Sequence, residues 1–181
     1  MEPIVITERL VLREMLQDDF EDLREMLQDP DVMCAWEHTF SDAQVQGWLD
    51  RQFERYRAGA GFWAVVEKRT GEMVGQAGLV WTDVNGERVL ELAYMLKKDH
   101  WGKGFAVEGS RACLAYAFEK MGIDKVYATV RPENLASVKV AERLGFKVCG
   151  KFVKNYDGKE MRHLIYTIGK RGIYDEKAIG Y

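Results

Sequence analysis

The feature that most constrains the fold is a glycine-containing turn, residues 101–106 (Trp-Gly-Lys-Gly-Phe-Ala). It lies between an apolar, strand-like run, Leu90–Leu96, and a run of helical length, Gly104–Met121. The first turn of a helix carries unpaired N–H groups and about half a positive charge, so it attracts a phosphate. Glycines let the backbone approach the anion because no Cβ intervenes. The turn therefore predicts a site for a pyrophosphate.

Two common nucleotide-binding motifs do not fit this turn. A P-loop requires Gly-x-x-x-x-Gly-Lys-Ser/Thr, but Lys97 stands at its first position and Gly104 follows Lys103. The dinucleotide fingerprint Gly-x-Gly-x-x-Gly/Ala requires a small residue at its last position, which Val107 occupies here. The sequence therefore argues against both motifs.

The turn instead resembles the motif Gln/Arg-x-x-Gly-x-Gly/Ala of the GNAT acetyltransferases, which binds the pyrophosphate of coenzyme A. Gly104 and Ala106 match its last two positions, and Trp101 stands where Gln or Arg is most usual. Taken alone, Gly-x-Gly is a weak signal, but here the segments on both sides of the turn also match.

The wider stretch is similar to the ribosomal-protein N-acetyltransferase branch of that family (RimJ/RimL type). The matching segments are residues 91–96 (Glu-Leu-Ala-Tyr-Met-Leu) and 100–108 (His-Trp-Gly-Lys-Gly-Phe-Ala-Val-Glu). The resemblance extends from residues 7–10 (Thr-Glu-Arg-Leu) to about Lys170. It implies an N-acetyltransferase that uses acetyl-CoA and transfers the acetyl group directly, without a covalent enzyme intermediate.

Composition limits the class of protein. With 181 residues, 47% of them hydrophobic, the chain can form a real core, and we expect one domain over residues 1–170 with a C-terminal tail at 171–181. The net charge of −3 argues against nucleic acid as the main partner, because such proteins need a basic face. No long apolar run or signal-peptide pattern occurs. We expect a cytoplasmic monomer or homodimer with no membrane partner.

The cysteines and histidines predict neither a disulfide framework nor a metal site. Cys34, Cys113 and Cys149 are odd in number and far apart, which is typical of free thiols. No Cys-x-x-Cys or His-x-x-x-His spacing occurs. Cys113 belongs to a stripe of small residues in the run 104–121, which indicates packing against a sheet rather than a nucleophile.

Periodicity predicts an α/β (α+β) fold: a mixed, mostly antiparallel central sheet with helices on both faces. Ser41 and Gln44 form a capping box, Asn85-Gly86 indicates a hairpin, and Asn134 is a natural N-cap. This order of elements is also that of the GNAT fold. The predicted strands cover 4–14, 62–68, 73–81, 89–96, 124–130, 146–154 and 159–168, and the predicted helices begin near 17, 41, 104 and 134.

In the resembled family, the strand before the turn splays from the strand after the crossover helix, and the pantetheine arm enters the gap. Backbone groups of residues 92–96 would bind the pantetheine amides, and N–H groups of 102–106 the pyrophosphate. A lysine in a turn is usually only solvated, so direct contact by Lys103 is the less favoured alternative. The resemblance thus implies these cofactor-binding residues: Leu92, Ala93, Tyr94, Met95, Leu96, Trp101, Gly102, Lys103, Gly104, Phe105, Ala106, Asn134 and Ser137.

The resemblance also implies catalytic roles. Asn134 and Ser137 match an Asn-x-x-Ser element in which the Asn holds the pantetheine arm and the Ser donates to the leaving thiolate. A capping role would explain Asn134, and a solvated hydroxyl Ser137, without any ligand. Glu91 opens the cofactor strand, where several GNAT enzymes place a base; a charge facing solvent is the alternative. A glutamate of pKa about 4.3 is a poor base unless it is partly buried or acts through water. Tyr94 is a weaker polar candidate.

The acceptor amine is predicted from free energies. Deprotonating a lysine-like amine of pKa about 10.4 at pH 7 costs roughly 4.6 kcal/mol, whereas an α-amine of pKa about 8 costs roughly 1.4 kcal/mol. A protein N-terminus is therefore the first candidate, and a polyamine or other small amino compound the second. In the resembled family the first two helices and the loop between them overhang the acceptor site, so the resemblance implies Trp36 and His38 as candidate acceptor-binding residues, although packing explains each ring as well. His163, on the last predicted strand, could titrate near neutrality and is a third candidate. A non-catalytic acyl-CoA sensor, and nucleotide binding at the turn, remain alternatives.

Overall fold

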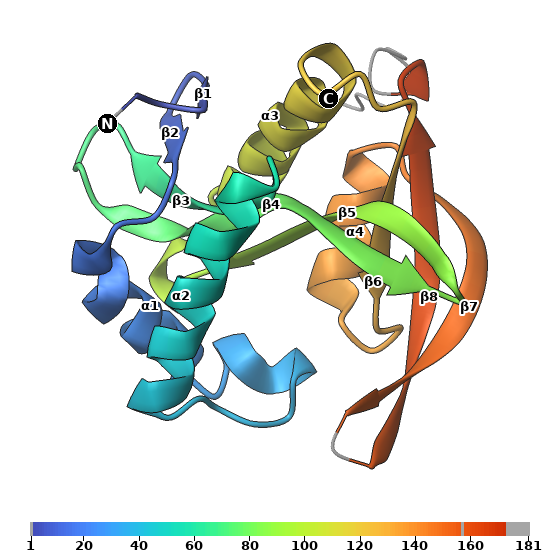
Figure 1. Cartoon of the computed structure of the whole chain (residues 1–181), viewed down its shortest axis with the longest axis horizontal. Coiled ribbons are helices and arrows are strands. Elements are labelled where there is room, and N and C mark those ends of the chain that lie inside the picture. The colour runs from blue at the N-terminus through green and yellow to red at the C-terminus, as the bar shows by residue number, and fades with distance from the viewer. Residues whose placement is uncertain (1, 157, 173–181) are drawn as a thin grey trace. The chain divides into compact units, whose positions relative to one another are not determined.

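Eight strands form one mixed sheet of order β1-β2-β3-β4-β5-β6-β8-β7 in the computed structural model, which describes residues 2–156 and 158–172 (Figure 1). The pairs β1–β2, β2–β3, β3–β4, β6–β8 and β7–β8 are antiparallel, whereas β5 and β6 are parallel. This confirms the predicted mixed, mostly antiparallel sheet. The chain divides into two compact units, residues 1–80 with 93–113 and residues 81–92 with 114–181.

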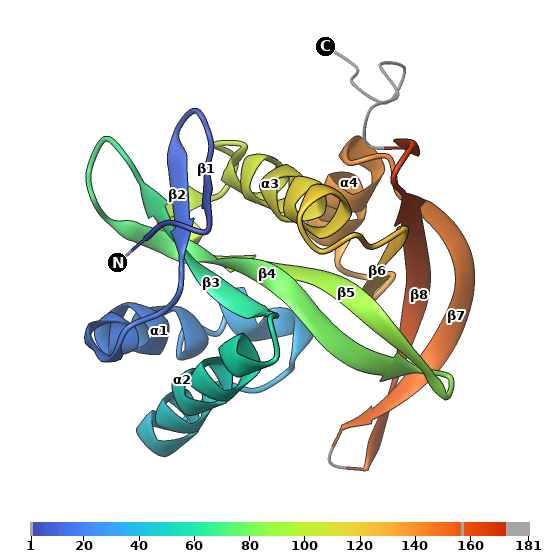
Figure 2. The ribbon, with the colours of Figure 1, turned by 45° about the horizontal axis from the view of Figure 1, so that its top comes forward.

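The first unit contains the N-terminal strands and helices. Its sheet is covered on both faces, by α1 and α2 on one side and by the first half of α3 on the other (Figure 2). The elements that lie in this unit, or begin or end in it, are β1 (Val5–Ile6), β2 (Leu10–Arg13), β3 (Gly61–Glu67), β4 (Met73–Val84), β5 (Glu87–Leu96), α1 (Phe20–Leu27), α2 (Asp42–Arg57) and α3 (Phe105–Glu119), with 3-10 turns η1 (Gln17–Asp19), η2 (Val32–Ala35) and η3 (Lys98–His100).

Side chains of β4 alternate between the two faces of this sheet, as the two-residue period of a strand requires. Gln76 is buried toward α2, where its side-chain oxygen accepts a hydrogen bond of 3.0 Å from the indole of Trp48. Ala77 is buried on the opposite face, and a Cβ on Gly109 of α3 would lie 3.9 Å from it. These are ordinary van der Waals distances, so α3 packs on the sheet at Gly109 with room for no more than a small side chain.

The prediction of one strand over residues 4–14 is wrong. The chain turns at residues 7–9, and β1 and β2 pair as a hairpin with Val5 opposite Leu12. The Thr7 hydroxyl accepts a hydrogen bond of 2.9 Å from the Leu10 N–H and closes this turn. The turn contains neither Gly nor Pro, so the sequence carries no strong signal for it.

The second unit consists of the antiparallel ladder β6-β8-β7 with helix α4. Its elements are β6 (Lys125–Val130), α4 (Leu135–Arg143), β7 (Lys147–Tyr156) and β8 (Lys159–Gly169). One face of the ladder carries an apolar cluster of Val84, Val89 and Ile165, with Tyr127 and Phe152 packed against it. Glu91 and His163 lie on the same face, since Glu91 is opposite Tyr127 and His163 is opposite Phe152.

Local signals in the sequence placed several turns correctly. Ser41 and Gln44 form the predicted capping box, with the Ser41 N–H donating to the Gln44 side chain at 2.8 Å. Asn85 and Gly86 have φ values of 55° and 82°, as a tight hairpin turn requires. Gly145 has a φ of 88° where α4 ends. These predictions are confirmed.

The division of the chain into a domain at residues 1–170 and a tail at 171–181 stays a prediction. The proposed single domain over residues 1–170 is neither supported nor opposed by the fold, and most of the tail at 171–181 lies outside the described residues. None of the described helices combines the length and the apolar character that crossing a membrane would require.

Candidate active site

The glycine turn presents unpaired backbone donors at the start of α3. Gly102 and Gly104 have φ values of 73° and 83°, in the left-handed region that favours glycine. The Trp101 N–H donates to the Lys98 carbonyl at 3.1 Å, and the first helical bond runs from the Glu108 N–H to the Gly104 carbonyl at 3.0 Å. Within the part of the chain that the structure describes, the N–H groups of residues 102–107 between these two bonds have no acceptor. They are therefore available to an anion.

Arg9, which lies just before β2, holds the turn by contacts with its backbone and with the helix that follows. Its Nη1 donates to the Lys103 carbonyl at 2.9 Å, and its Nε donates to Oε2 of Glu108 at 2.6 Å. The guanidinium also lies 4.7 Å from the centre of the buried Phe105 ring. Burial raises the pKa of Glu108, but hydrogen bonds from Thr7 and Arg9 outweigh burial and hold that pKa below its ordinary value. Arg9 thus joins the carbonyl of the turn to the first turn of α3.

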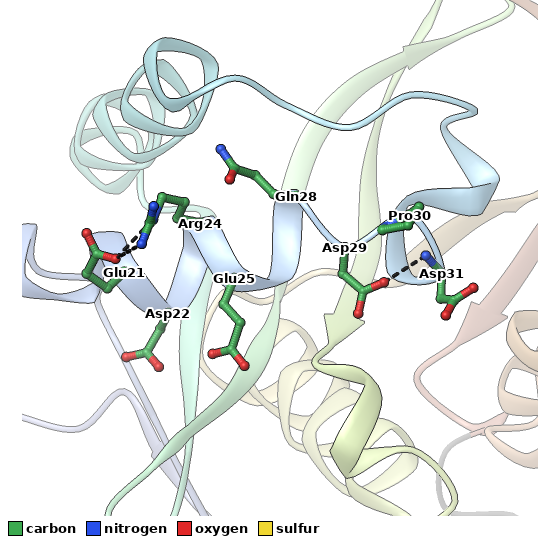
Figure 3. Close-up of a pocket in the computed structure, with 8 residues that line it drawn as sticks. All are labelled: Glu21, Asp22, Arg24, Glu25, Gln28, Asp29, Pro30 and Asp31. Atoms are coloured by element: carbon green, nitrogen blue, oxygen red, sulfur yellow. Dashed lines mark hydrogen bonds and ion pairs between the residues drawn. The ribbon is translucent and has the colours of Figure 1, made fainter.

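The segment just before the turn is joined by ion pairs to acidic residues of α1 and of the turn that follows it. These acidic residues also line a hollow of about 810 Å³ (Figure 3). The buried Lys97 binds Asp22 at 2.7 Å and Glu25 at 2.6 Å, and Lys98 pairs with Asp31. Burial lowers the pKa of Lys97, but the two carboxylates more than compensate, so its pKa is raised. These acids already have cationic partners in the chain, so we assign the hollow a scaffolding role for the turn.

Residues 93–96 of β5, the part of the predicted cofactor strand in the first unit, approach β4 closely. A Cβ on Gly75 would lie 2.4 Å from the Met95 carbonyl oxygen and 2.7 Å from the Cα of Leu96, so only glycine fits there. Leu96 is buried, whereas Ala93, Tyr94 and Met95 are half-buried. The side chains of Ala93 and Met95 pack against the core that α1 and α2 cover.

An aromatic cluster from the connection between α1 and α2 packs against the core that these two helices cover. The rings of Trp36 and Trp48 meet edge to face with centroids 6.0 Å apart, and Phe40 lies 5.9 Å from Trp48. His38 is exposed, stacks on Phe40 at 5.7 Å, and directs Nδ1 to the Trp36 carbonyl at 2.9 Å. The structure thus brings together Trp36 and His38, the two predicted acceptor-binding residues of this connection.

In the second unit, Glu91 is half-buried and anchored to the neighbouring strand. Glu91 lies opposite Tyr127 in the parallel register of β5 and β6. Its Oε1 accepts a hydrogen bond of 3.0 Å from the Thr129 N–H and a second from the Thr129 hydroxyl. Burial raises the pKa of Glu91, while the Thr129 hydrogen bonds and the charge of Lys154 lower it by less. The net result is a carboxyl of raised pKa that is held by Thr129 and does not face solvent as a strand-edge charge would. Its neighbour Leu92 is buried.

Asn134 and Ser137 meet at the start of α4. Oδ1 of Asn134 accepts a hydrogen bond of 3.1 Å from the Ser137 N–H, so Asn134 is the N-cap of the helix. This explains the oxygen of Asn134 without a ligand. Ser137 is half-buried in the first helical turn.

His163 is buried on β8, and its ring is in contact with Phe152, with centroids 5.3 Å apart. Nδ1 lies 3.0 Å from the Met161 carbonyl. Burial lowers the pKa of His163 and the positive charges of Lys154 and Arg131 lower it further, although the Met161 hydrogen bond opposes this. The imidazole is therefore held in its neutral form at pH 7.

Stability should depend on pH through His163. Its folded pKa lies below the unfolded value of about 6.5, so the unfolded chain binds more protons as the pH falls. The free energy of unfolding should therefore decrease as the pH falls through that value, and His163→Gln should reduce this dependence. Urea unfolding at about pH 7.5 and about pH 5.5 measures it. His38→Gln, which removes an exposed imidazole, is the control; an unchanged pH slope in His163→Gln would contradict the assignment.

A model of the acetyltransferase (GNAT) domain family matches residues 9–147. The chain belongs to the GNAT acetyltransferase family. It is 37% identical over 143 residues to the uncharacterized protein YkkB of Bacillus subtilis (strain 168), covering 78% of this chain and 83% of that protein. It is 32% identical to the uncharacterized N-acetyltransferase p20 of Bacillus licheniformis, covering 83% and 85%. A solved GNAT-family acetyltransferase from Bacillus anthracis superposes with a TM-score of 0.79 at 26% identity, covering 92% of this chain and 98% of that one.

Membership in the GNAT family makes the protein an acetyl-CoA-dependent N-acetyltransferase. The glycine turn of this GNAT enzyme fits the diphosphate of that cofactor on its own geometry. The amides of residues 102–106 have no acceptor among the described residues, and a Cβ added to Gly102 would meet nothing within 4 Å. Trp101 differs from the other predicted residues of the turn, because both of its donors already have acceptors in the chain. Its N–H donates to the Lys98 carbonyl, and its indole donates to the Leu96 carbonyl at 3.0 Å.

The predicted site residues of this GNAT enzyme are divided between the two units. Residues 93–106, Trp36 and His38 belong to the first unit, and Glu91, Leu92, Asn134, Ser137 and His163 belong to the second. No group of three or more metal-binding side chains occurs among residues 2–156 and 158–172.

Two residues that support the site are not predicted by the sequence. Arg9 falls within the Thr-Glu-Arg-Leu resemblance without an implied role, and Thr129 looks like an ordinary strand residue. Their partners, Glu108 and Glu91, are 99 and 38 positions away. No local pattern indicates such pairings.

Proposed function

We propose that this GNAT enzyme acetylates the α-amine of a protein N-terminus in the cytoplasm, as members of the RimJ/RimL-type branch do. The observation that carries the proposal is the half-buried carboxyl of Glu91, anchored by Thr129 and raised in pKa by burial. A carboxylate whose pKa is raised toward neutrality is a stronger base than an exposed one. It can accept the proton of an α-amine, which costs roughly 1.4 kcal/mol to remove at pH 7, more easily than that of a lysine-like amine at roughly 4.6 kcal/mol.

Each of the chain's own groups has a separate role in this proposal. Acetyl-CoA supplies the thioester whose carbonyl carbon accepts the amine. Glu91 takes the proton of the acceptor ammonium, directly or through water, and so leaves the nitrogen lone pair free to form the C–N bond. The hydroxyl of Ser137 donates a hydrogen bond or proton to the sulfur as the C–S bond breaks. The second proton that the nitrogen loses on becoming an amide ends on the sulfur, directly or by replacing the proton of Ser137, so that a neutral thiol leaves.

The cofactor would be held by backbone groups. The amides of residues 102–106 would bind the diphosphate at the N-terminus of α3. The dipoles of the fifteen residues of this helix are aligned and give its N-terminus a partial positive charge. Backbone groups of residues 92–96 would bind the amides of the pantetheine arm, with Asn134 assisting. The carbonyl of Lys103 accepts a hydrogen bond from Arg9, whereas its side chain is exposed. The ammonium would add a long-range positive charge near the diphosphate.

For the acceptor, the candidate contacts of the first unit are Trp36 and His38 with their aromatic cluster. The candidate contact of the second unit is the neutral imidazole of His163. Structures that share this fold act on different amines: a spermidine N-acetyltransferase from Vibrio cholerae has a TM-score of 0.75 at 20% identity, and a ribosomal L7/L12 α-N-protein acetyltransferase 0.77 at 18%. At such identities the likeness concerns the fold alone. The acceptor therefore needs a direct test.

A panel of amines tests the acceptor class by release of free thiol from acetyl-CoA. Peptides with a free α-amine should be acetylated with a higher kcat/KM than the same peptides blocked at the N-terminus and carrying one internal lysine, and higher than spermidine. The blocked peptide is the matched control, because it keeps the sequence and loses only the α-amine. Preference for spermidine would contradict the proposed acceptor. Binding of coenzyme A without thiol release for any amine would favour an acyl-CoA sensor, and competition by ATP would favour a nucleotide site.

A further inference from the structure

The two oxygens of the Glu91 carboxylate differ in their hydrogen bonding. Both hydrogen bonds from Thr129, one from its N–H at 3.0 Å and one from its hydroxyl, end on Oε1. Within residues 2–156 and 158–172, Oε2 accepts no hydrogen bond. The described polar atoms that are both enclosed and unpaired are His100 Nδ1 and Ser110 Oγ, so Oε2 keeps accessible surface. One oxygen is therefore fixed and the other is open.

The position of Thr129 in the sheet explains why it can hold the carboxylate. Glu91 lies opposite Tyr127, and Thr129 is two residues further along β6, so its N–H and side chain repeat the orientation of Tyr127. A continued parallel ladder would give the Thr129 N–H a carbonyl of β5. The side chain of Glu91 takes that donor instead. The backbone donor cannot be removed by mutation, whereas the hydroxyl can, and this makes the contact testable.

We propose that Thr129 is the positioning residue of the base: it holds Oε1 of Glu91 and leaves Oε2 as the atom that takes the proton of the acceptor amine. The inference rests on the proposed function of Glu91. The step is a proton transfer alone: the N–H bond of the ammonium breaks, an O–H bond forms at Oε2, and the nitrogen keeps the electron pair. No oxidant or further reactant is involved.

The groups that act on Glu91 determine the direction of the expected change. Burial raises its pKa; the hydroxyl and N–H of Thr129 on β6 and the ammonium of Lys154 on β7 favour the ionised form. On β8, His163 lies on the same face as Lys154, since Phe152 is opposite His163 and Lys154 is two residues beyond Phe152. His163 is held neutral and adds no charge at pH 7. Removing the Thr129 hydroxyl should therefore raise the pKa of Glu91 further.

The test is a carboxyl ¹³C NMR titration of the full chain labelled at glutamate Cδ, with Glu91→Gln identifying the resonance. In Thr129→Val, which keeps the side-chain shape and loses the hydroxyl, the midpoint should move up by about one pH unit, the size expected for one charge-assisted hydrogen bond. Thr129→Ser restores the hydroxyl and should restore the wild-type midpoint. Thr167→Val removes a hydroxyl of β8 that contacts the Val126 carbonyl and should leave the midpoint unchanged.

The pH dependence of kcat separates this inference from the function on which it rests. The ionisation of the acceptor amine is the same for every variant, so a difference between variants reports the enzyme. The acidic limb should move up in Thr129→Val together with the NMR midpoint. An unchanged midpoint in Thr129→Val would overturn the role of Thr129 and leave Glu91 as the base, provided that Glu91→Gln still loses activity. An unchanged kcat profile in Glu91→Gln would overturn both.

Discussion

Glu91→Gln should lower kcat for N-acetylation by about 10²–10⁴-fold, the usual contribution of a positioned general base. The amide has nearly the shape of the carboxyl, and its oxygen can still accept the two hydrogen bonds that Thr129 donates to Oε1. The fold and the affinity for acetyl-CoA should therefore stay near those of the wild type. The loss would be confined to proton removal from the acceptor, so raising the pH should partly restore the rate by supplying neutral amine.

Glu87→Gln is the matched control for this prediction. Glu87 begins the same strand, β5, is exposed, and carries the same charge as Glu91. Its replacement removes one negative charge without touching the Thr129 contact, and kcat should stay near the wild-type value. Steady-state rates with a free α-amine peptide measure both variants. Equal rates for Glu91→Gln and Glu87→Gln would show that Glu91 is not the base.

Gly104→Ala should weaken the binding of acetyl-CoA by about tenfold or more. With a φ of 83°, a residue with a Cβ is strained at this position by roughly 1–2 kcal/mol, and about 1.4 kcal/mol corresponds to tenfold in affinity. The new Cβ would also lie 3.3 Å from Nη2 of Arg9, close enough to disturb the guanidinium that holds the Lys103 carbonyl. Relief of this strain would move the amides away from the position that the diphosphate needs. Isothermal titration with coenzyme A measures the effect.

Gly122→Ala separates this effect from a general loss of stability. Gly122 follows α3, has a φ of 68°, and a Cβ there would meet nothing within 4 Å. Its backbone strain should therefore resemble that of Gly104→Ala, and thermal unfolding should show a comparable loss of stability. The affinity for coenzyme A should fall only in Gly104→Ala. A similar loss of affinity in both variants would mean that the turn has no special part in binding.

The parts of the fold that the sequence predicted are those governed by local chemistry. The capping box at Ser41, the Asn85-Gly86 hairpin and the end of α4 at Gly145 each depend on residues within four positions of one another. The hairpin of β1 and β2 was missed because a threonine side chain closes it, where glycine or proline would have indicated a turn.

The candidate site divides in the same way. The glycine turn was predicted because its two glycines and the following helix are adjacent in sequence. The contact of Arg9 with Glu108 was not predicted, because the two residues meet only when packing brings β2 and α3 together. Thr129 likewise contacts Glu91 only because the parallel register places Glu91 opposite Tyr127. Contacts of this kind are decided by tertiary structure, and a single sequence carries no periodic signal for them.

A crystal structure of the complex with coenzyme A tests the central proposal most directly. The proposal predicts diphosphate oxygens within hydrogen-bonding distance of the N–H groups of residues 102–106, and the pantetheine arm alongside residues 92–96. Coenzyme A bound with its diphosphate away from these amides, or with residues 92–96 not contacting the arm, would contradict the proposed site.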